Sequence, residues 1–212
     1  MQLGFCGESV SGIDILNNML NENYMFVAVV ISIIGNLSYI AGTLQGKIKP
    51  NRVSFFLWSF IALIAFAAEI KEGVGIQSLT TLMVGLGPLS IFIASFVNKK
   101  SYWKITRFDI ICGVLSLTGL LLWLITKVGN TAILFALIAD ALAAVPTIVK
   151  VYNYPDTERP FPWLTSVIVG LITLLTITDW SFAYYAFPLS ILITNLLVFA
   201  LINYRSKTFK LI

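Results

Sequence analysis

The sequence GPLSIFI (residues 87–93) is echoed by FPLSILI (residues 187–193). Both copies place a proline and a serine between apolar side chains, and the two prolines, Pro88 and Pro188, lie 100 residues apart. A shared tetrapeptide is a weak signal by itself, because a chain built from few residue types repeats short words by chance. The echo indicates a duplicated unit only if the segments around it also match in order.

The composition is that of an integral membrane protein. Hydrophobic residues make up 58% of the 212 residues and charged residues 11%, whereas charged residues approach about a quarter of a typical soluble domain. A helix that crosses the hydrocarbon core of a bilayer needs about 20 apolar residues. The seven runs of about this size are residues 24–46, 53–70, 76–97, 108–126, 131–152, 162–178 and 181–204.

The basic residues predict the orientation of these runs. If all seven cross the membrane, 12 of the 14 Lys and Arg residues fall on one side, and only Lys71 and Lys127 fall on the other. Lys and Arg are retained in the cytoplasm during membrane insertion. We therefore expect seven spans in a plasma membrane or bacterial inner membrane, with the N-terminus outside and the C-terminus in the cytoplasm. Membrane topology accounts for the basic residues behind the net charge of +4. A nucleic-acid partner is therefore not expected.

Residues 1–23 lack the basic region and the apolar run of a cleavable signal peptide, so we expect them to stay attached. Within them Ile13, Leu16 and Leu20 recur at helical spacing. This spacing favours a short helix that lies on the outer membrane surface. A disordered tail is the alternative.

Two further matches support the duplication. The segment GNLSYIAGT in the first run and ADALAAVPT in the fifth pair Asn36 with Asp140 at an offset of 104 residues. The loops that follow pair Arg52 with Arg159 at an offset of 107. Loops can absorb the differences between these offsets and the first one of 100. Three matches on corresponding segments, in order, predict an internal repeat.

The repeat explains why the number of runs is odd. Three spans carry the chain from outside to inside, so a second parallel copy needs one additional crossing, which the fourth run supplies. The expected fold class is an all-α membrane protein with seven transmembrane helices, arranged as two parallel triple-helix bundles and a linker helix (3+1+3). The expected parts are an outer segment (1–23), the first bundle (24–100), the linker with its loop (101–127), the second bundle (128–204) and a basic cytoplasmic tail (205–212).

With this architecture the chain resembles the PQ-loop and SWEET-like membrane transporters. The Pro-Gln dipeptide of that family, near the end of the first helix of each bundle, stands here as Gly42-Thr43 and as Pro146-Thr147. Proline is kept once and glutamine is absent from both. The resemblance implies transport of a small solute by two bundles that rock around a central site. In SWEET transporters asparagines of the third and seventh helices contact sugar, which implies a substrate contact for Asn195, with Ser95 at the matching place.

The residues themselves also point to a central site. Asp140 is the one carboxylate near the middle of a run, where an ionisable group is costly unless it is paired, hydrated or protonated. Asn36 is its repeat partner, and Tyr39 shares the polar face of the same helix. We take Asn36, Tyr39, Asp140 and Asn195 as substrate-binding candidates, and Asp140 as the proton-coupling candidate, as in some PQ-loop relatives. The alternative is that these groups only hydrogen-bond neighbouring helices.

Prolines and tryptophans complete the set of candidates. Proline has no amide hydrogen, so Pro88, Pro146 and Pro188 each free a backbone carbonyl in a helix and are candidate hinges or static bends. Trp58 lies deep enough to line a cavity and is the fifth substrate-binding candidate. Trp163 lies near a predicted interface, with Trp103 and Trp180, where tryptophans anchor a helix.

The leading hypothesis is a multi-pass transporter of a small polar solute by alternating access, coupled to protons through Asp140. The alternative is a receptor or sensor that binds a small ligand or peptide on the same fold without transport. The partners expected are a small-molecule solute and the lipid bilayer, and a homo-oligomer remains open. Histidine is absent and no catalytic constellation is recognisable, so we expect no enzyme, no cofactor and no metal.

Overall fold

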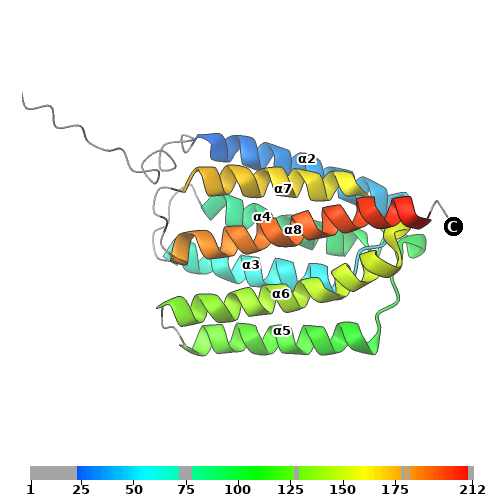
Figure 1. Ribbon diagram of the computed structural model, residues 1–212. Coiled ribbons are helices and arrows are strands. Elements are labelled where there is room, and N and C mark those ends of the chain that lie inside the picture. The colour runs from blue at the N-terminus through cyan, green and yellow to red at the C-terminus, as the bar shows by residue number, and fades with distance from the viewer. Residues whose placement is uncertain (1–22, 72–77, 127–128, 178–179, 181, 210–212) are drawn as a thin grey trace, which may run out of the picture.

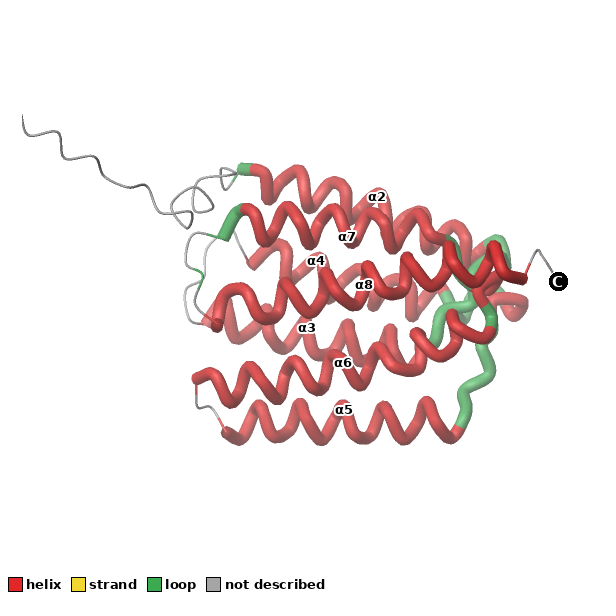
Figure 2. The backbone as a smooth tube through the Cα atoms, viewed as in Figure 1, coloured by secondary structure: helices red, strands yellow, loops and turns green. Residues whose placement is uncertain are grey.

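The computed structural model describes residues 23–71, 78–126, 129–177, 180 and 182–209 (Figure 1). This part of the chain is all-helical, and each of the seven apolar runs coincides with one α-helix, as predicted (Figure 2). The surface helix predicted within residues 1–23 lies outside the described residues. The helices are α2 (Tyr24–Leu44), α3 (Arg52–Lys71), α4 (Ser78–Ala94), α5 (Arg107–Thr126), α6 (Gly129–Asn153), α7 (Pro160–Leu175) and α8 (Phe182–Phe209).

Four of the helices contain a stretch long and apolar enough to cross a bilayer. The three remaining apolar stretches are shorter, namely Arg52–Ala67, Thr81–Ala94 and Pro160–Leu175. Large apolar side chains also cover the outside of the molecule, with Ile125 75% exposed and Val97 70% exposed. An apolar surface of this kind needs hydrocarbon around it. The long helices and their apolar surfaces indicate a membrane protein.

The helix ends are built from local caps. At the end of α2, Gly46 adopts a φ of 77° and donates to Thr43 O at 3.0 Å, while Lys47 N donates to Gly42 O at 2.9 Å. These two bonds form a Schellman motif, which requires the left-handed backbone that glycine accepts most readily. At the start of α3, Asn51 Oδ1 accepts from Val53 N at 3.0 Å. The turn and the cap place the loop of residues 45–51 tightly across the end of the bundle.

The helix α8 is longer than predicted. It continues through residues 205–209, which the sequence assigned to a separate basic tail. The side chain of Arg205 explains the extension, because its Nε donates to Tyr152 O at 2.9 Å and its guanidinium lies 4.4 Å from the centre of the Tyr152 ring. The end of α8 is thereby attached to the end of α6.

Six helices form a closed ring and the seventh lies outside it. Around the ring, α2 contacts α4, α4 contacts α3, α3 contacts α6, α6 contacts α8, α8 contacts α7, and α7 returns to α2. The helix α5 packs on the outer side, against α6 and α3 (Figure 1). Each ring helix therefore turns one face to its neighbours and one to a shared centre.

One end of the ring carries most of the positive charge, and we call it the basic end. It contains the loops of residues 45–51, 95–106 and 154–159 and the end of α8 (Figure 1). The basic residues assigned to it are Lys47, Lys49, Arg52, Lys99, Lys100, Lys104, Arg107, Lys150, Arg159, Arg205 and Lys207, and Lys210 lies outside the described residues. The opposite end holds the first residues of α2, α4, α6 and α8.

The contact between α2 and α7 depends on the absence of a side chain at Gly35. A Cβ atom built there would lie 2.0 Å from Thr165 Oγ1. Gly35→Val should therefore force α2 and α7 apart and lower the free energy of unfolding by about 1 to 3 kcal/mol, the usual range for overpacking. Thermal unfolding of the purified protein in detergent measures the change.

The matched control is Ala200→Val, which adds the same kind of side chain at an exposed position of α8. Its unfolding midpoint should stay at the value of the unchanged protein. Equal midpoints for both variants would contradict the close α2–α7 contact.

Candidate functional site

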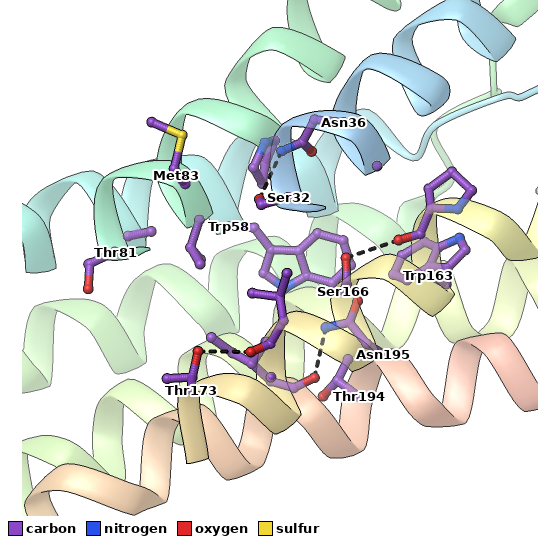
Figure 3. A pocket seen from close by; sticks show the side chains of 18 of the residues that line it. Ser32, Asn36, Trp58, Thr81, Met83, Trp163, Ser166, Thr173, Thr194 and Asn195 are labelled. Atoms are coloured by element: carbon purple, nitrogen blue, oxygen red, sulfur yellow. Dashed lines mark hydrogen bonds between the residues drawn. The ribbon is translucent and has the colours of Figure 1, made fainter. Parts of the chain in front are cut away.

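A cavity of about 200 Å³ lies inside the ring (Figure 3). All six ring helices contribute lining residues, and none of the described residues that line it belongs to α5. The five side chains predicted to bind substrate all line this one cavity, although they come from four helices: Asn36, Tyr39, Trp58, Asp140 and Asn195. The tertiary structure thus brings together residues that are up to 159 positions apart in the sequence.

The predicted hinge residues are placed differently from one another. Pro88 in α4 and Pro188 in α8 both lie inside their helices and line the cavity. Pro146 also lies inside its helix, α6, but it is not among the lining residues. Val84, whose carbonyl loses its usual amide partner to Pro88, lines the cavity as well. The repeated sequence of the two prolines therefore faces the central space from two opposite parts of the ring.

Asp140 is buried without a partner. Its side chain belongs to a residue that is only 6% exposed, and it makes no hydrogen bond or ion pair with any residue that the structure describes. No Lys or Arg is among the residues that line the cavity. A buried carboxylate is costly without compensation. The cavity therefore contains one carboxyl group that the described residues leave without a partner.

The neighbouring amides and hydroxyls donate to their own helices. Asn195 Nδ2 donates to Ile191 O at 2.8 Å, and Asn36 Nδ2 lies 3.4 Å from Ser32 Oγ (Figure 3). Each bond uses one of the two amide hydrogens, so each side chain keeps one N–H donor and its acceptor oxygen. They also fix the two side chains along their helices, one on α8 and one on α2.

Four aromatic rings close the basic end of the cavity. We call them the aromatic cluster: Tyr39, Phe55, Trp58 and Trp163, all of which line the cavity. Their ring centres form a cycle, with separations of 5.0 Å from Tyr39 to Phe55, 5.3 Å from Phe55 to Trp58, 6.2 Å from Trp58 to Trp163 and 6.3 Å from Trp163 to Tyr39. Contacts of this spacing leave no room for a solute between the rings.

The placement of Trp163 corrects the sequence-based interpretation. It was expected to anchor α7 at the membrane surface, but it is 5% exposed and packs in the core. Its indole nitrogen donates to Glu158 Oε2 at 3.2 Å. The reason is the start of α7 at Pro160, which places Trp163 in the first turn with its side chain toward the centre of the ring. Hydropathy locates such a residue along the membrane axis and does not say which side of the helix it occupies.

A buried ion pair lies behind the aromatic cluster. Lys150 Nζ pairs with Glu158 Oε1, and their side chains are 1% and 0% exposed. Lys150 also donates to Lys49 O at 2.7 Å, and the Tyr39 hydroxyl donates to Glu158 Oε1 at 2.8 Å. Because both charges have several polar partners, the cost of removing them from water is offset locally. In the sequence Lys150 is only one of the basic residues assigned to one side, and no spacing rule predicts its pair with Glu158.

Ser95, which the sequence predicts as the counterpart of Asn195, is not among the residues that line the cavity. It is fully buried near the basic end, where its Oγ accepts from Arg52 Nε at 3.0 Å and its carbonyl accepts from Arg52 Nη2 at 2.6 Å. Arg52 also lies 4.0 Å from the centre of the Phe96 ring. The position of Ser95 therefore serves to hold the start of α3 against the end of α4.

No family model, curated protein or solved structure matches this chain. Among the described residues, no group of three or more His, Cys, Asp or Glu side chains is placed to hold a metal ion. The chemistry available at the site is therefore that of one carboxylate, two amides, several hydroxyls and five aromatic side chains, namely the four of the cluster and Phe187. This set is suited to holding a small polar molecule.

The ion pair should stabilise the closed basic end. Replacing Lys150 with Met leaves Glu158 charged and buried, and replacing Glu158 with Gln leaves Lys150 charged and buried. Each single change should destabilise the protein by about 3 to 5 kcal/mol, because an uncompensated charge remains. The double variant Lys150→Met/Glu158→Gln should cost less than the sum of the two, as measured by a double-mutant cycle of thermal or denaturant unfolding.

The same cycle on Lys99 and Asp156, which are both exposed, is the control. Lys99→Met and Asp156→Asn should have effects within about 0.5 kcal/mol and should be additive. Additive losses for Lys150 and Glu158 would contradict the coupling between them.

Proposed function

We propose that the chain is a membrane transporter that moves a small polar solute by alternating access around the central cavity. The observation that carries the proposal is the position of the cavity inside a ring of six apolar helices, with polar groups near the middle of their length. Binding sites of secondary transporters lie in this place, near the midplane and between repeated units. The polar side chains in the cavity are costly for folding and are best explained by a solute.

The packing of the helices supports a 3+1+3 arrangement. If α2, α3 and α4 correspond to α6, α7 and α8, then every contact in the ring has a counterpart: α2–α4 matches α6–α8, α3–α4 matches α7–α8, and α3–α6 matches α7–α2. Two parallel bundles related by an axis through the cavity have these contacts. We propose α5 as the linker, with the basic end in the cytoplasm according to the distribution of Lys and Arg.

Alternating access requires that the two ends of the cavity open in turn. The aromatic cluster and the Lys150–Glu158 pair close the basic end. In the other direction the lining extends to Thr81 in α4 and Thr173 in α7, close to the opposite ends of their helices. We propose that this conformation faces outward, and that the two bundles bend at Pro88, Pro146 and Pro188 when the basic end opens.

A receptor or sensor is the second candidate. The closed basic end favours it, because a ligand could be bound from the other side without any path through the protein. Accessibility of the cavity from the two sides of the membrane distinguishes the two functions without knowledge of the solute.

A single cysteine in the cavity should react from both sides of the membrane if the protein transports. The variant is Ser166→Cys in a background of Cys6→Ser and Cys112→Ala, since Ser166 lines the cavity and these are the two native cysteines. Because alternating access exposes the cavity to each side in turn, a membrane-impermeant thiol reagent should label it from either face of oriented vesicles.

Lys99→Cys in the same background is the control for sidedness, because Lys99 is exposed at the basic end. It should react from one side only. Labelling of Ser166→Cys from one side only would favour a receptor over a transporter.

Uptake into proteoliposomes tests transport directly, using a panel of labelled sugars, amino acids, vitamins and amines. Asn195→Leu should reduce the initial rate for the transported compound about tenfold or more, because a buried polar contact is lost and the cavity becomes smaller. Asn203→Leu is the matched control: Asn203 Nδ2 donates to Phe199 O at 2.8 Å, as Asn195 does to Ile191 O, but Asn203 does not line the cavity. Equal rates for the two variants would contradict the assignment of the cavity.

We also propose Asp140 as the group that couples uptake to protons. The same liposomes are therefore compared with and without an inward proton gradient. Asp140→Asn should remove the dependence on the gradient. A gradient dependence that survives in this variant would reject Asp140 as the proton carrier and leave transport itself standing.

A further inference from the structure

We infer that the solute bound in the cavity is a small organic cation that carries an ammonium group, with Asp140 as its counter-ion. The inference deepens the proposed function and rests on it for the role of the cavity in transport. Binding itself requires no flux, so the two can be tested separately.

The first argument is charge. Asp140 is nine-tenths buried, has no partner among the described residues, and shares the cavity with no basic side chain. Lys150, which lies outside the cavity lining, is already paired with Glu158 behind the aromatic cluster. A cation placed beside Asp140 supplies the missing partner. A neutral sugar leaves the ionised carboxylate uncompensated, and an amino acid adds a second carboxylate for which the cavity offers no cation.

The second argument is the balance of hydrogen-bond donors and acceptors. One amide hydrogen of Asn195 is directed at Ile191 O, and the hydroxyls of Ser166 and Thr173 donate to Pro162 O and Val169 O at 3.1 and 2.9 Å (Figure 3). A hydroxyl that donates to a carbonyl one turn earlier keeps only its lone pairs for a ligand, whereas the amide keeps one N–H donor and its oxygen. The carbonyl of Val84 loses its usual donor to Pro88 and is a further acceptor. These hydroxyl, amide and carbonyl oxygens are acceptors that an ammonium group can use.

The third argument is the aromatic cluster. The negative faces of Trp, Tyr and Phe attract cations, and Trp does so most strongly. In the cluster, Trp58 meets Trp163 at 71° and Phe55 at 83°, so the rings stand nearly perpendicular to one another. The rings pack against one another without room between them, so a cation attracted to them would lie in the cavity beside the cluster. The volume of about 200 Å³ restricts that cation to a small molecule.

The proton-coupling role of Asp140 agrees with this inference. A single carboxylate can hold either an ammonium group or a proton, one after the other. An exchange of one for the other would balance the charge of the cavity in both directions of transport.

Binding to the purified full-length protein in detergent tests the inference. The probes are ethanolamine, choline and butylammonium, each compared with an uncharged isostere in which carbon or oxygen replaces the nitrogen. We expect a saturable change in tryptophan fluorescence with at least one ammonium probe, at an affinity about tenfold or more above that of its isostere. Glycine betaine, in which a carboxylate replaces the hydroxymethyl group of choline, should bind more weakly than choline.

Two variants separate the contributions to binding. Asp140→Asn keeps the shape of the side chain and should lower the affinity for the ammonium probe about tenfold or more, a change of about 1.4 kcal/mol. Trp58→Leu should lower the affinity for the ammonium probe more than the affinity for its isostere. Trp58→Phe should keep part of the difference between these two affinities. Asp156→Asn, an exposed carboxylate outside the cavity, is the control and should bind as the unchanged protein does. Thermal unfolding verifies that each variant is folded.

The possible results are distinguishable. Equal binding of the ammonium probes and their isosteres, no binding of any ammonium probe, or unchanged affinity in Asp140→Asn would overturn the inference. Uptake of a neutral solute by a protein that binds no ammonium probe would also overturn the inference. The transporter proposal would then still stand. Ammonium binding that depends on Asp140, without any flux, would support the inference and reject transport.

Discussion

The hydrocarbon core of a bilayer cannot hydrogen-bond to a protein, and this constraint accounts for the arrangement of polar groups throughout the molecule. The backbone is satisfied within helices. Polar side chains at the basic end are bonded to one another, as in the contact between Arg52 and Ser95. The polar side chains of Asn36, Asp140 and Asn195, near the middle of their helices, line one cavity, away from the surface that carries Ile125 and Val97.

The protein buries charge in two ways that differ in their consequences. Lys150 and Glu158 neutralise each other and share further bonds with Tyr39 and Trp163, so they need nothing from outside. Such a pair stabilises one arrangement of the surrounding helices. Asp140 is buried to a similar degree without any such partner. A group of this kind is costly in the empty protein and becomes favourable when a ligand or a proton neutralises it. In the proposed transporter the first kind of burial would belong to a closure, and the second to a binding site.

The two halves of the ring share their packing more than their chemistry. Pro88 and Pro188 both face the cavity, and so do Asn36 and Asp140. The pair Ser95 and Asn195 is different, because Asn195 lines the cavity while Ser95 is engaged with Arg52. If the two halves are a duplicated unit, as we propose, they need the same helix contacts twice in order to close the ring. The proposed solute need not share this symmetry, so the side chains that would contact it are free to diverge.

The sequence by itself determined the number of helices and approximately where each begins and ends, because apolar runs of membrane length are visible without knowledge of contacts. It also singled out Asn36, Tyr39, Trp58, Asp140 and Asn195, since polar or large aromatic residues stand out in apolar helices. Only the tertiary structure decided that these five share one cavity, that Trp163 faces inward, and that Tyr39 bonds to Glu158 across 119 positions. Hydropathy fixes the depth of a residue in the membrane. The rotation of a helix about its axis, and the neighbour it meets there, depend on packing between distant segments.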